Sequence, residues 1–289
     1  MIKFRTELVP EAIQPPLQSS DRIMVLGSCF AENIGERLHR GGLAVCQNPL
    51  GIQYNPLSLN RVMGYLSGTL SFQIDDIFEH QGRFRHWDIH GKLCGATFED
   101  TARHVTDAIV HAQPFLKEAH WLYLTLGSAH VWYRGDRPVG NCHKMPSADF
   151  QRKRLSIDDS VMALQRLIQQ ARRLNPGLHI LMTVSPVRYK RDGFIESQRS
   201  KSVLLLAIER LCHTTENVHY FPAYELIMDD LRDYRFFERD LLHPSDEAVD
   251  YIWDKFQQCA VSSAAISSLK EREKAWRRNQ HIPSESQNR

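Results

Sequence analysis

The sequence predicts an α/β fold built on a mainly parallel sheet with helices on both faces. Amphipathic helical patterns lie between five short apolar runs, and this alternation is typical of parallel sheets. We expect the strands, numbered along the chain, to take the order 2-1-3-4-5. The five runs predicted as buried strands are Ile23–Gly27, Leu43–Cys46, Trp121–Leu126, His179–Val184 and Val218–Phe221.

Helical patterns follow the strands in order. The clearest is Ile157–Leu174, where apolar residues recur on one face and Asn175-Pro-Gly177 ends the pattern. Thr101–Ala119 is predicted as a helix interrupted at Pro114, because proline lacks the N–H that a helix interior needs. The other predicted helices are Glu32–Arg40, Leu57–Ser67, Ser197–Leu211 and Glu247–Gln258.

Two segments interrupt the alternation. Ser71–Gly95 has the composition of an inserted loop or hairpin, and Val131–Val139 that of a short β-hairpin with Arg134-Gly-Asp136 near its turn. We predict a single domain over residues 1–266 and a polar C-terminal tail over 267–289. Within the tail, Leu269–Arg278 is predicted as a charged helix and His281–Arg289 as disordered.

Composition narrows the class of protein. The 289 residues carry a formal net charge of +2, too balanced to indicate a nucleic-acid or anionic-membrane partner. The N-terminus lacks the apolar core of a signal peptide, and no apolar run reaches membrane-spanning length. Six widely spaced cysteines show no Cys-x-x-Cys pair, so we expect free thiols in a cytoplasmic protein. The sequence carries no signal for an oligomeric state.

The most informative segment follows the first predicted strand. The apolar run ends at Gly27, Ser28 and Cys29 come next, and a helical stretch begins near Ala31. A side chain at such a strand–turn–helix junction stands beside free backbone N–H groups. Those groups and the helix dipole favour a developing negative charge, so this junction is a candidate for nucleophilic catalysis.

Near the C-terminus, Asp240 and His243 lie three residues apart, just before Pro244-Ser245 and a helix. On a tight turn this spacing lets the carboxylate accept the imidazole N–H and leaves the other ring nitrogen as a general base. The alternative is that Asp240 caps a turn and His243 is an ordinary surface residue. The junction at Ser28 and Cys29 favours the catalytic interpretation.

Two residues are candidates for an oxyanion hole. Gly51 has no Cβ, so its backbone N–H can approach a substrate oxygen closely. Asn141 can supply a side-chain amide. Each residue also has a purely structural interpretation, as a turn glycine and as a loop asparagine.

Several ordered segments resemble the GSCFA family of the SGNH (GDSL-like) hydrolase superfamily. The resemblance begins with Gly27-Ser-Cys-Phe-Ala31 and covers about residues 3–260. It implies a three-layer α/β/α sandwich, a nucleophile in a Gly-Asp-Ser elbow and an Asp-x-x-His motif. The further matching segments are Asn48–Pro56, Leu126-Gly127, Val131-Trp132, Asn141–Lys144, Thr183–Val187, Leu231–Arg235 and Asp240–Pro244.

The chain departs from the superfamily pattern in two places. If the elbow glycines are aligned, Ser28 takes the aspartate position and Cys29 that of the nucleophilic serine; a shift by one makes Ser28 the nucleophile. We favour Cys29 and expect a lowered thiol pKa at the helix N-terminus, although a buried packing thiol is the alternative. The second departure is Gly127-Ser-Ala-His130, where Gly-x-Asn-Asp is usual, so Asn141 or His130 would have to replace the oxyanion asparagine.

The leading hypothesis is an SGNH-type acyl esterase that forms an acyl-enzyme on a small-molecule or carbohydrate ester, without a cofactor. Acyl transfer on the same scaffold is one alternative, and a non-catalytic carbohydrate- or protein-binding module is another. A metal site formed by His86, Asp88, His90 and Cys94 is a weaker interpretation, because the spacing matches no ordinary zinc pattern. We therefore predict no metal.

Overall fold

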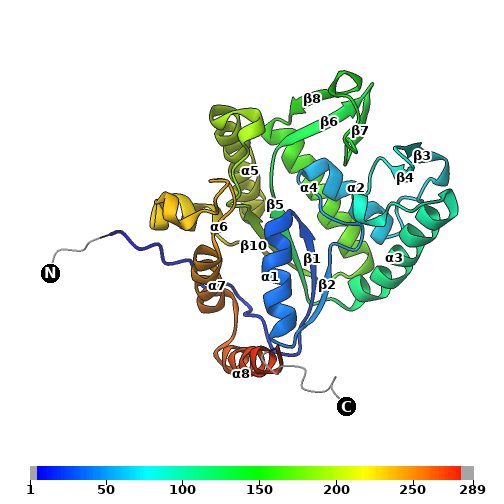
Figure 1. Ribbon diagram of the computed structural model, residues 1–289. Helices are drawn as coiled ribbons and strands as arrows, with labels where there is room; N and C mark the ends of the chain where they lie inside the picture. Colours follow the sequence, from blue (N-terminus) through cyan, green and yellow to red (C-terminus); the bar gives the residue numbers. More distant parts are fainter. Residues whose placement is uncertain (1–4, 281–289) are drawn as a thin grey trace, which may run out of the picture.

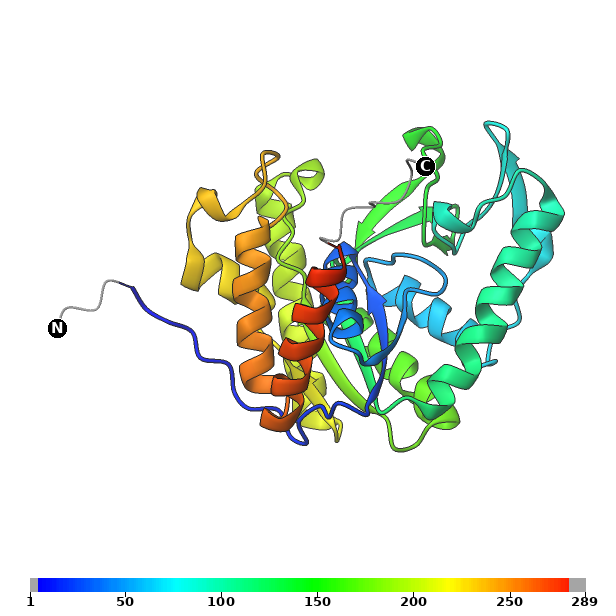
Figure 2. The same cartoon turned by 60° about the horizontal axis from the view of Figure 1, so that its bottom comes forward.

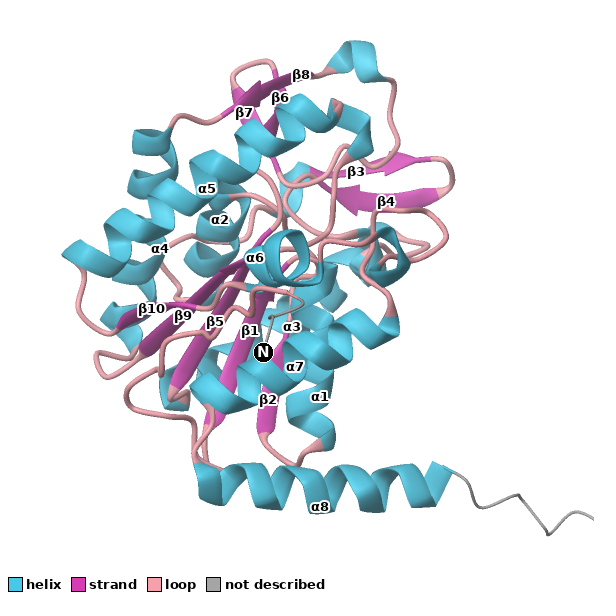
Figure 3. Cartoon of the chain, turned by 90° about the vertical axis from the view of Figure 1, so that its left-hand side faces the viewer, coloured by secondary structure: helices cyan, strands magenta, loops and turns pink. Residues whose placement is uncertain are grey.

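A five-stranded parallel sheet forms the centre of the molecule (Figure 1). The computed structural model describes residues 5–280, except for the side chains of residues 277, 279 and 280. The strand order is β10-β9-β5-β1-β2, which Figure 3 shows from the side, and it confirms the predicted order 2-1-3-4-5. The strands are β1 (Arg22–Gly27), β2 (Ala44–Gln47), β5 (Trp121–Leu126), β9 (His179–Val184) and β10 (Val218–Tyr220).

The central strands are apolar along their whole length because both faces of the sheet are covered. Every residue of β5 is buried. In the register of the sheet Gly27 lies opposite Thr125, and Leu126 lies opposite Val184. The carboxyl ends of β1, β5 and β9 therefore meet at one edge, where sites in open α/β sheets lie.

Helices cover the two faces and give the three-layer α/β/α arrangement. Alternate residues of β1 enter different cores: Met24 and Leu26 pack with α2 to α5, while Ile23 and Val25 pack with α1, α7 and α8. Figure 2 shows α7 and α8 on one flank of the sheet and α3 on the other. The helices are α1 (Cys29–Arg40), α2 (Pro56–Leu66), α3 (Phe98–Glu118), α4 (Ile157–Leu174), α5 (Phe194–Thr214), α6 (Ala223–Glu225), α7 (Asp246–Ala260) and α8 (Ser263–Gln280).

Helix α3 corrects one prediction, because it runs through Pro114 without interruption. Pro114 lies on the exposed face of α3. Because proline has no N–H, the helix carbonyl four residues earlier lacks its usual donor, and water can bind it instead. The opposite face stays packed, since Ala112 and Leu116 are buried. Burial on that face therefore outweighs the local cost of the proline.

Two small antiparallel sheets stand apart from the main sheet. The first is the hairpin β3 (Ile77–His80) and β4 (Arg83–His86), within the predicted insertion. The second contains the predicted hairpin, β6 (His130–Arg134) and β7 (Arg137–Val139), and an unpredicted third strand, β8 (Gln151–Arg154). Because β8 is a charged edge strand, it lacks the apolar pattern by which buried strands are recognised.

Helix α8 crosses the predicted boundary between residues 266 and 267. Leu269 is buried in the core beside α1, and the guanidinium of Arg40 lies 4.1 Å from the ring centre of Trp276. The predicted helix Leu269–Arg278 is thus part of a longer helix that packs on the domain. The predicted disorder of residues 281–289 lies outside the described residues.

Short helical turns complete the described part of the chain. The segment η5 is a π-helix, and the others are 3-10 turns. They are η1 (Ile74–Asp76), η2 (Gly91–Leu93), η3 (Ser147–Asp149), η4 (Lys190–Asp192), η5 (Leu226–Leu231) and η6 (Tyr234–Phe236). Across residues 5–280, no helix combines the length and apolar character needed to span a bilayer.

Candidate active site

The junction between β1 and α1 is a tight elbow. Gly27 has φ +141°, and a Cβ there would lie 2.2 Å from the carbonyl oxygen of Thr125, so only glycine fits. Ser28 caps α1 and is fully buried, and its hydroxyl has no hydrogen-bond partner within residues 5–280. Cys29 is the first residue of α1 and is partly exposed. Of the two predicted nucleophiles, Cys29 is the one that solvent can reach.

The pKa of the Cys29 thiol is raised, so the prediction of a lowered pKa is wrong. Burial raises its pKa above the ordinary value, and the N–H groups of Phe30 and Cys29 only partly offset this effect. The nearby carboxylate of Glu32 raises the pKa further, whereas the amine of Lys201 lowers it. The helix N-terminus therefore does supply N–H groups to this sulfur, but desolvation is the larger effect.

The loop after β2 lies directly against the elbow. The N–H of Gly27 donates to Asn48 Oδ1 at 2.9 Å, and the N–H of Gln53 donates to the carbonyl of Gly27 at 3.0 Å. Gly51 has φ +81°, and its N–H donates to the carbonyl of Asn48 at 2.7 Å. The backbone donor predicted for an oxyanion hole at Gly51 is thus engaged in a turn. The buried Nδ2 of Asn48 has no partner in the described part of the chain.

The loop after β5 also meets this region. The N–H groups of Gly127 and Ser128 both donate to the carbonyl of Tyr54, at 2.8 and 2.9 Å. His130 begins β6, and burial together with the positive charges of Arg152 and Arg154 lowers its pKa to about 4. The imidazole is therefore neutral at pH 7.

Asn141 lies in the loop after β7. Its Oδ1 accepts the N–H of His143 at 2.8 Å, and its own N–H donates to the carbonyl of Trp87 at 3.1 Å. These bonds leave the side-chain Nδ2 as its available donor. The preceding residue, Gly140, is packed so closely on Gln53 that a Cβ would lie 2.8 Å from Oε1. The loop of Asn141 therefore lies beside the loop that contacts the elbow.

The structure joins Asp240 and His243 as their spacing predicts. The imidazole Nδ1 lies 2.6 Å from Asp240 Oδ2, while the N–H groups of Leu242 and His243 donate to Oδ1 at 2.8 and 3.0 Å. The three hydrogen bonds, two of them from backbone N–H groups, lower the pKa of Asp240 to about 2. Both side chains are about half exposed.

The turn that carries His243 is fixed at the carboxyl edge of the sheet. The N–H of Arg188, in the loop after β9, donates to the carbonyl of Leu242 at 3.1 Å. Across residues 5–280, no hydrogen bond joins His243 to Ser28 or Cys29. Such bonds often tighten only when a substrate is bound.

The residues of the metal interpretation have other partners. Asp88 is buried and accepts hydrogen bonds from Arg61 at 2.6 Å and from the Tyr65 hydroxyl at 2.7 Å. Within the described residues, no group of three or more His, Cys, Asp or Glu side chains is arranged to hold a metal ion.

Sequence reasoning missed Lys201 and Tyr189, which lie at the loops that follow β5 and β9. Lys201 Nζ donates to the carbonyls of Gly127 at 2.7 Å and Ser185 at 2.6 Å. The hydroxyl of Tyr189 is buried and has no partner among the described residues. The helical spacing in the sequence indicates the burial of Lys201, because it lies three residues before Leu204 and so on the same buried face of α5.

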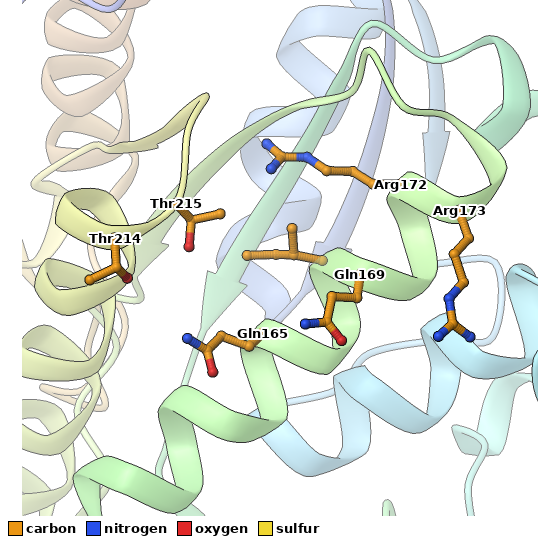
Figure 4. Close-up of a pocket in the computed structure, with 7 residues that line it drawn as sticks. Gln165, Gln169, Arg172, Arg173, Thr214 and Thr215 are labelled. Carbon is orange, nitrogen blue, oxygen red and sulfur yellow. The ribbon is translucent and has the colours of Figure 1, made fainter.

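The hollow shown in Figure 4 lies away from these residues. It measures about 570 Å³ and lies between the C-terminal ends of α4 and α5. Arg172 on its wall donates to the carbonyls of Leu178 and Glu216, which precede β9 and β10, so the hollow is at the amino edge of the sheet. A cavity of about 150 Å³ lies near the His243 turn instead, lined by Arg188, Ile227, Met228, Arg232, Asp233, Tyr234 and Phe237.

Among solved structures, a family 3 carbohydrate esterase from Clostridium thermocellum is similar, with a TM-score of 0.37 and 11% identity over 87% of this chain and 98% of that one. A carbohydrate esterase family 3 protein from Talaromyces cellulolyticus has a TM-score of 0.40 and 8% identity over 87% of this chain and 99% of that one. No curated protein sequence gives a significant match. The model of the GSCFA family matches residues 22–256, and the chain therefore belongs to the GSCFA family.

Proposed function

We propose that this chain is an SGNH-type acyl esterase that acts through a covalent acyl-enzyme, with Cys29 as the nucleophile. The observation that carries the proposal is the hydrogen-bonded pair of Asp240 and His243 at 2.6 Å, at the sheet edge where β1 delivers Cys29 to the start of α1. A carboxylate that holds one imidazole nitrogen leaves the other free as a base.

Exposure supports Cys29 over Ser28 as the attacking group. Ser28 is fully buried, whereas Cys29 is partly exposed. The Ser28 hydroxyl would have to leave its buried position before it reached a substrate. In the proposed reaction the Cys29 sulfur bonds to the ester carbonyl carbon, and His243 takes the thiol proton. His243 then gives this proton to the leaving alcohol, and water hydrolyses the acyl-enzyme.

We assign the oxyanion first to the N–H groups of Cys29 and Phe30, at the N-terminus of α1. The available amide of Asn141 is the second proposed donor, and the unpartnered Nδ2 of Asn48 is a third, already anchored to the elbow through its Oδ1. Gly51 would first have to release its hydrogen bond to Asn48. Donors aimed at the developing charge stabilise the transition state without reorganising during the reaction.

The proposed substrate is a small-molecule or carbohydrate ester, an acetylated sugar being the example that SGNH relatives suggest by analogy alone. Exposed aromatic side chains near the His243 turn support a substrate with an apolar face. They are Phe194, which is 49% exposed, and Tyr234, which is 60% exposed. All six cysteines are free thiols, which supports a reducing, cytoplasmic location.

A screen of acetyl and longer-chain esters, with mass spectrometry of the protein, tests the proposal. Trypsin releases Ile23–Arg37, whose one cysteine is Cys29. A substrate should add its acyl mass to this peptide, and Cys29→Ala should lose both the adduct and the turnover. If Cys29→Ala turns over at the wild-type rate, the proposed nucleophile is wrong.

One observation favours a non-catalytic binding module instead: no hydrogen bond links His243 to Cys29 in the described part of the chain. Calorimetry with neutral and acetylated oligosaccharides distinguishes the two functions. A binding module would hold such ligands equally well in the wild type and in His243→Ala, with no product formed. Acyl transfer would appear as a product that forms only when an acceptor alcohol or amine is added.

A further inference from the structure

We propose that Arg188 binds an anionic group, a carboxylate or a phosphate, in the alcohol part of the ester substrate. Arg188 belongs to the loop after β9 and lines the cavity of about 150 Å³ near the His243 turn. This inference rests on the proposed function, because it assumes an ester, and it narrows the substrate to acyl esters of alcohols that carry an acidic group. Anion binding at Arg188 can nevertheless be measured without turnover.

The guanidinium of Arg188 is held by aromatic rings and has no anionic partner. Its carbon Cζ lies 4.3 Å from the ring centre of Phe194 and 5.6 Å from those of Tyr234 and Phe237. Across residues 5–280, the guanidinium forms neither an ion pair nor a hydrogen bond. Stacking on a ring uses the face of a guanidinium, so the N–H groups at its edge stay free for two parallel hydrogen bonds to an oxyanion.

The lining of the cavity is net positive. Arg232 is a second cationic side chain in the lining, and it too forms no ion pair with the described residues. The acidic residue of the lining, Asp233, is already engaged: it accepts the N–H of Arg235 at 2.9 Å, and its carboxylate lies 3.7 Å from the Arg235 guanidinium. The rest of the lining is apolar or aromatic, and such surroundings strengthen a charge pair. The cavity therefore favours an anionic ligand.

The three rings also prepare Arg188 for binding. An arginine on an open surface loses rotamer freedom when it binds a ligand, and this loss reduces the affinity. The aromatic contacts restrict the side chain before a ligand arrives. Packing alone does not account for an arginine here, because a methionine would fill the space between aromatic rings without a charge and without donors that lack a protein acceptor.

The position of Arg188 indicates which part of the ester it contacts. Its backbone N–H donates to the carbonyl of Leu242 at 3.1 Å, one residue before His243. Phe237, one of the three rings, pairs with Pro244, the residue after His243. The cavity therefore adjoins the turn that carries the proposed base. Because His243 returns its proton to the leaving alcohol, the groups beside it face the alcohol part of the ester.

Calorimetry at pH 7 with amide analogues of an ester tests anion binding without turnover. The probes are para-acetamidobenzoate and the uncharged para-acetamidobenzamide. The wild type should bind the acid about ten- to a hundredfold more tightly, the range expected for hydrogen bonds to a charged group. The same titration with para-acetamidophenyl phosphate shows whether a phosphate or a carboxylate is preferred. If neither anion binds the wild type more tightly than the uncharged amide, the proposal is wrong.

Substitutions locate the bound anion. Arg188→Met should remove the preference for the acid, and Arg188→Lys should keep part of it, because lysine retains the charge but not the planar fork. Arg191→Met is the matched control: this guanidinium also lies over a ring, 4.8 Å from the centre of Trp132, but is not in the lining of the cavity. Arg191→Met should keep the full preference. Should Arg188→Met fail to fold, Arg188→Lys decides, and an undiminished preference in either folded variant would overturn the assignment to Arg188.

Turnover of the matching esters separates this inference from the proposed function. The ratio of kcat/KM for para-acetoxybenzoate to that for para-acetoxybenzamide should fall about tenfold or more from the wild type to Arg188→Met. A ratio that does not change would reject Arg188 as a determinant of specificity, while turnover itself would still support an esterase. A protein that prefers the acid in calorimetry through Arg188 but hydrolyses neither ester would reject the esterase and still support the anion site.

Discussion

The imidazole of His243 and the carboxylate of Asp240 form a 2.6 Å hydrogen bond that is organised by backbone as well as side-chain contacts. Because Oδ1 is already bound by the N–H groups of Leu242 and His243, Oδ2 is fixed toward Nδ1. This geometry holds the proton on Nδ1 and leaves Nε2 as the base.

His243→Ala should abolish ester turnover while the protein stays folded, since the side chain is about half exposed. Asp240→Asn should reduce kcat by about 10² to 10⁴, because an amide can present its N–H and favour the wrong tautomer. The measurement is kcat on the best ester found, with circular dichroism as the folding control. Wild-type turnover in His243→Ala would remove the imidazole from the mechanism.

The low pKa of Asp240, about 2, gives a pH prediction for turnover. Since Asp240 stays ionised throughout pH 4 to 9, it should contribute no inflection to the kcat profile in that range. If kcat instead falls at low pH with a midpoint near 4, and Asp240→Asn removes this fall, Asp240 would be the titrating group. Its pKa would then not be lowered to about 2 by its hydrogen bonds.

Gly27→Ala should destabilise the protein by about 3 kcal/mol or more, because the new Cβ would lie 2.2 Å from the rigid carbonyl oxygen of Thr125 in a central strand. Gly82→Ala is the matched control. Gly82 also has positive φ, at +69°, but nothing lies within 4 Å of the added Cβ, so the cost should be about 1 kcal/mol. Urea unfolding measures the loss of stability in each variant. Equal losses would show that the positive φ, and not the close approach of Thr125, is the reason that glycine is needed at the elbow.

The parts of the fold that depend on burial could be predicted from the sequence. The strands Trp121–Leu126 and His179–Val184 were predicted at their observed bounds, because continuous apolar runs mark strands covered on both faces. Strand β8 escaped prediction because Gln151–Arg154 is charged, and the continuity of α3 through Pro114 depends on which face of the helix is exposed.

The candidate site divides in the same way between local and long-range features. The contact of Asp240 with His243 follows from a spacing of three residues, so sequence reasoning could reach it. The raised pKa of Cys29 follows from its burial in the folded protein, and Lys201 reaches the carbonyl of Gly127, 74 residues away in the sequence. Neither feature can be deduced from local spacing. The bond that engages the Gly51 N–H likewise depends on the conformation of its turn.

The stability of the wild type relative to Lys201→Met should increase with pH between about 7 and 9. Burial lowers the pKa of Lys201 from 10.5 to about 7, so in this interval the unfolded chain holds a proton that the folded protein has released. Stability rises with pH wherever the unfolded state binds more protons, by up to about 1.4 kcal/mol for each pH unit. Below pH 7 both states hold the proton, and the difference between the variants should be constant.

Urea unfolding of both proteins at pH 6, 7, 8 and 9 checks this window, with a total relative change of about 2 to 3 kcal/mol expected between pH 7 and 9. The interval ends at pH 9 because buried thiols act in the opposite direction above it. The pKa of Cys46, for example, is raised by burial from 9.0 to about 11, so the unfolded chain loses that proton first and stability falls. This effect is common to both variants and cancels in their difference. A difference that stays constant from pH 6 to 9 would mean that Lys201 keeps its charge throughout that range when folded, and that burial has not lowered its pKa.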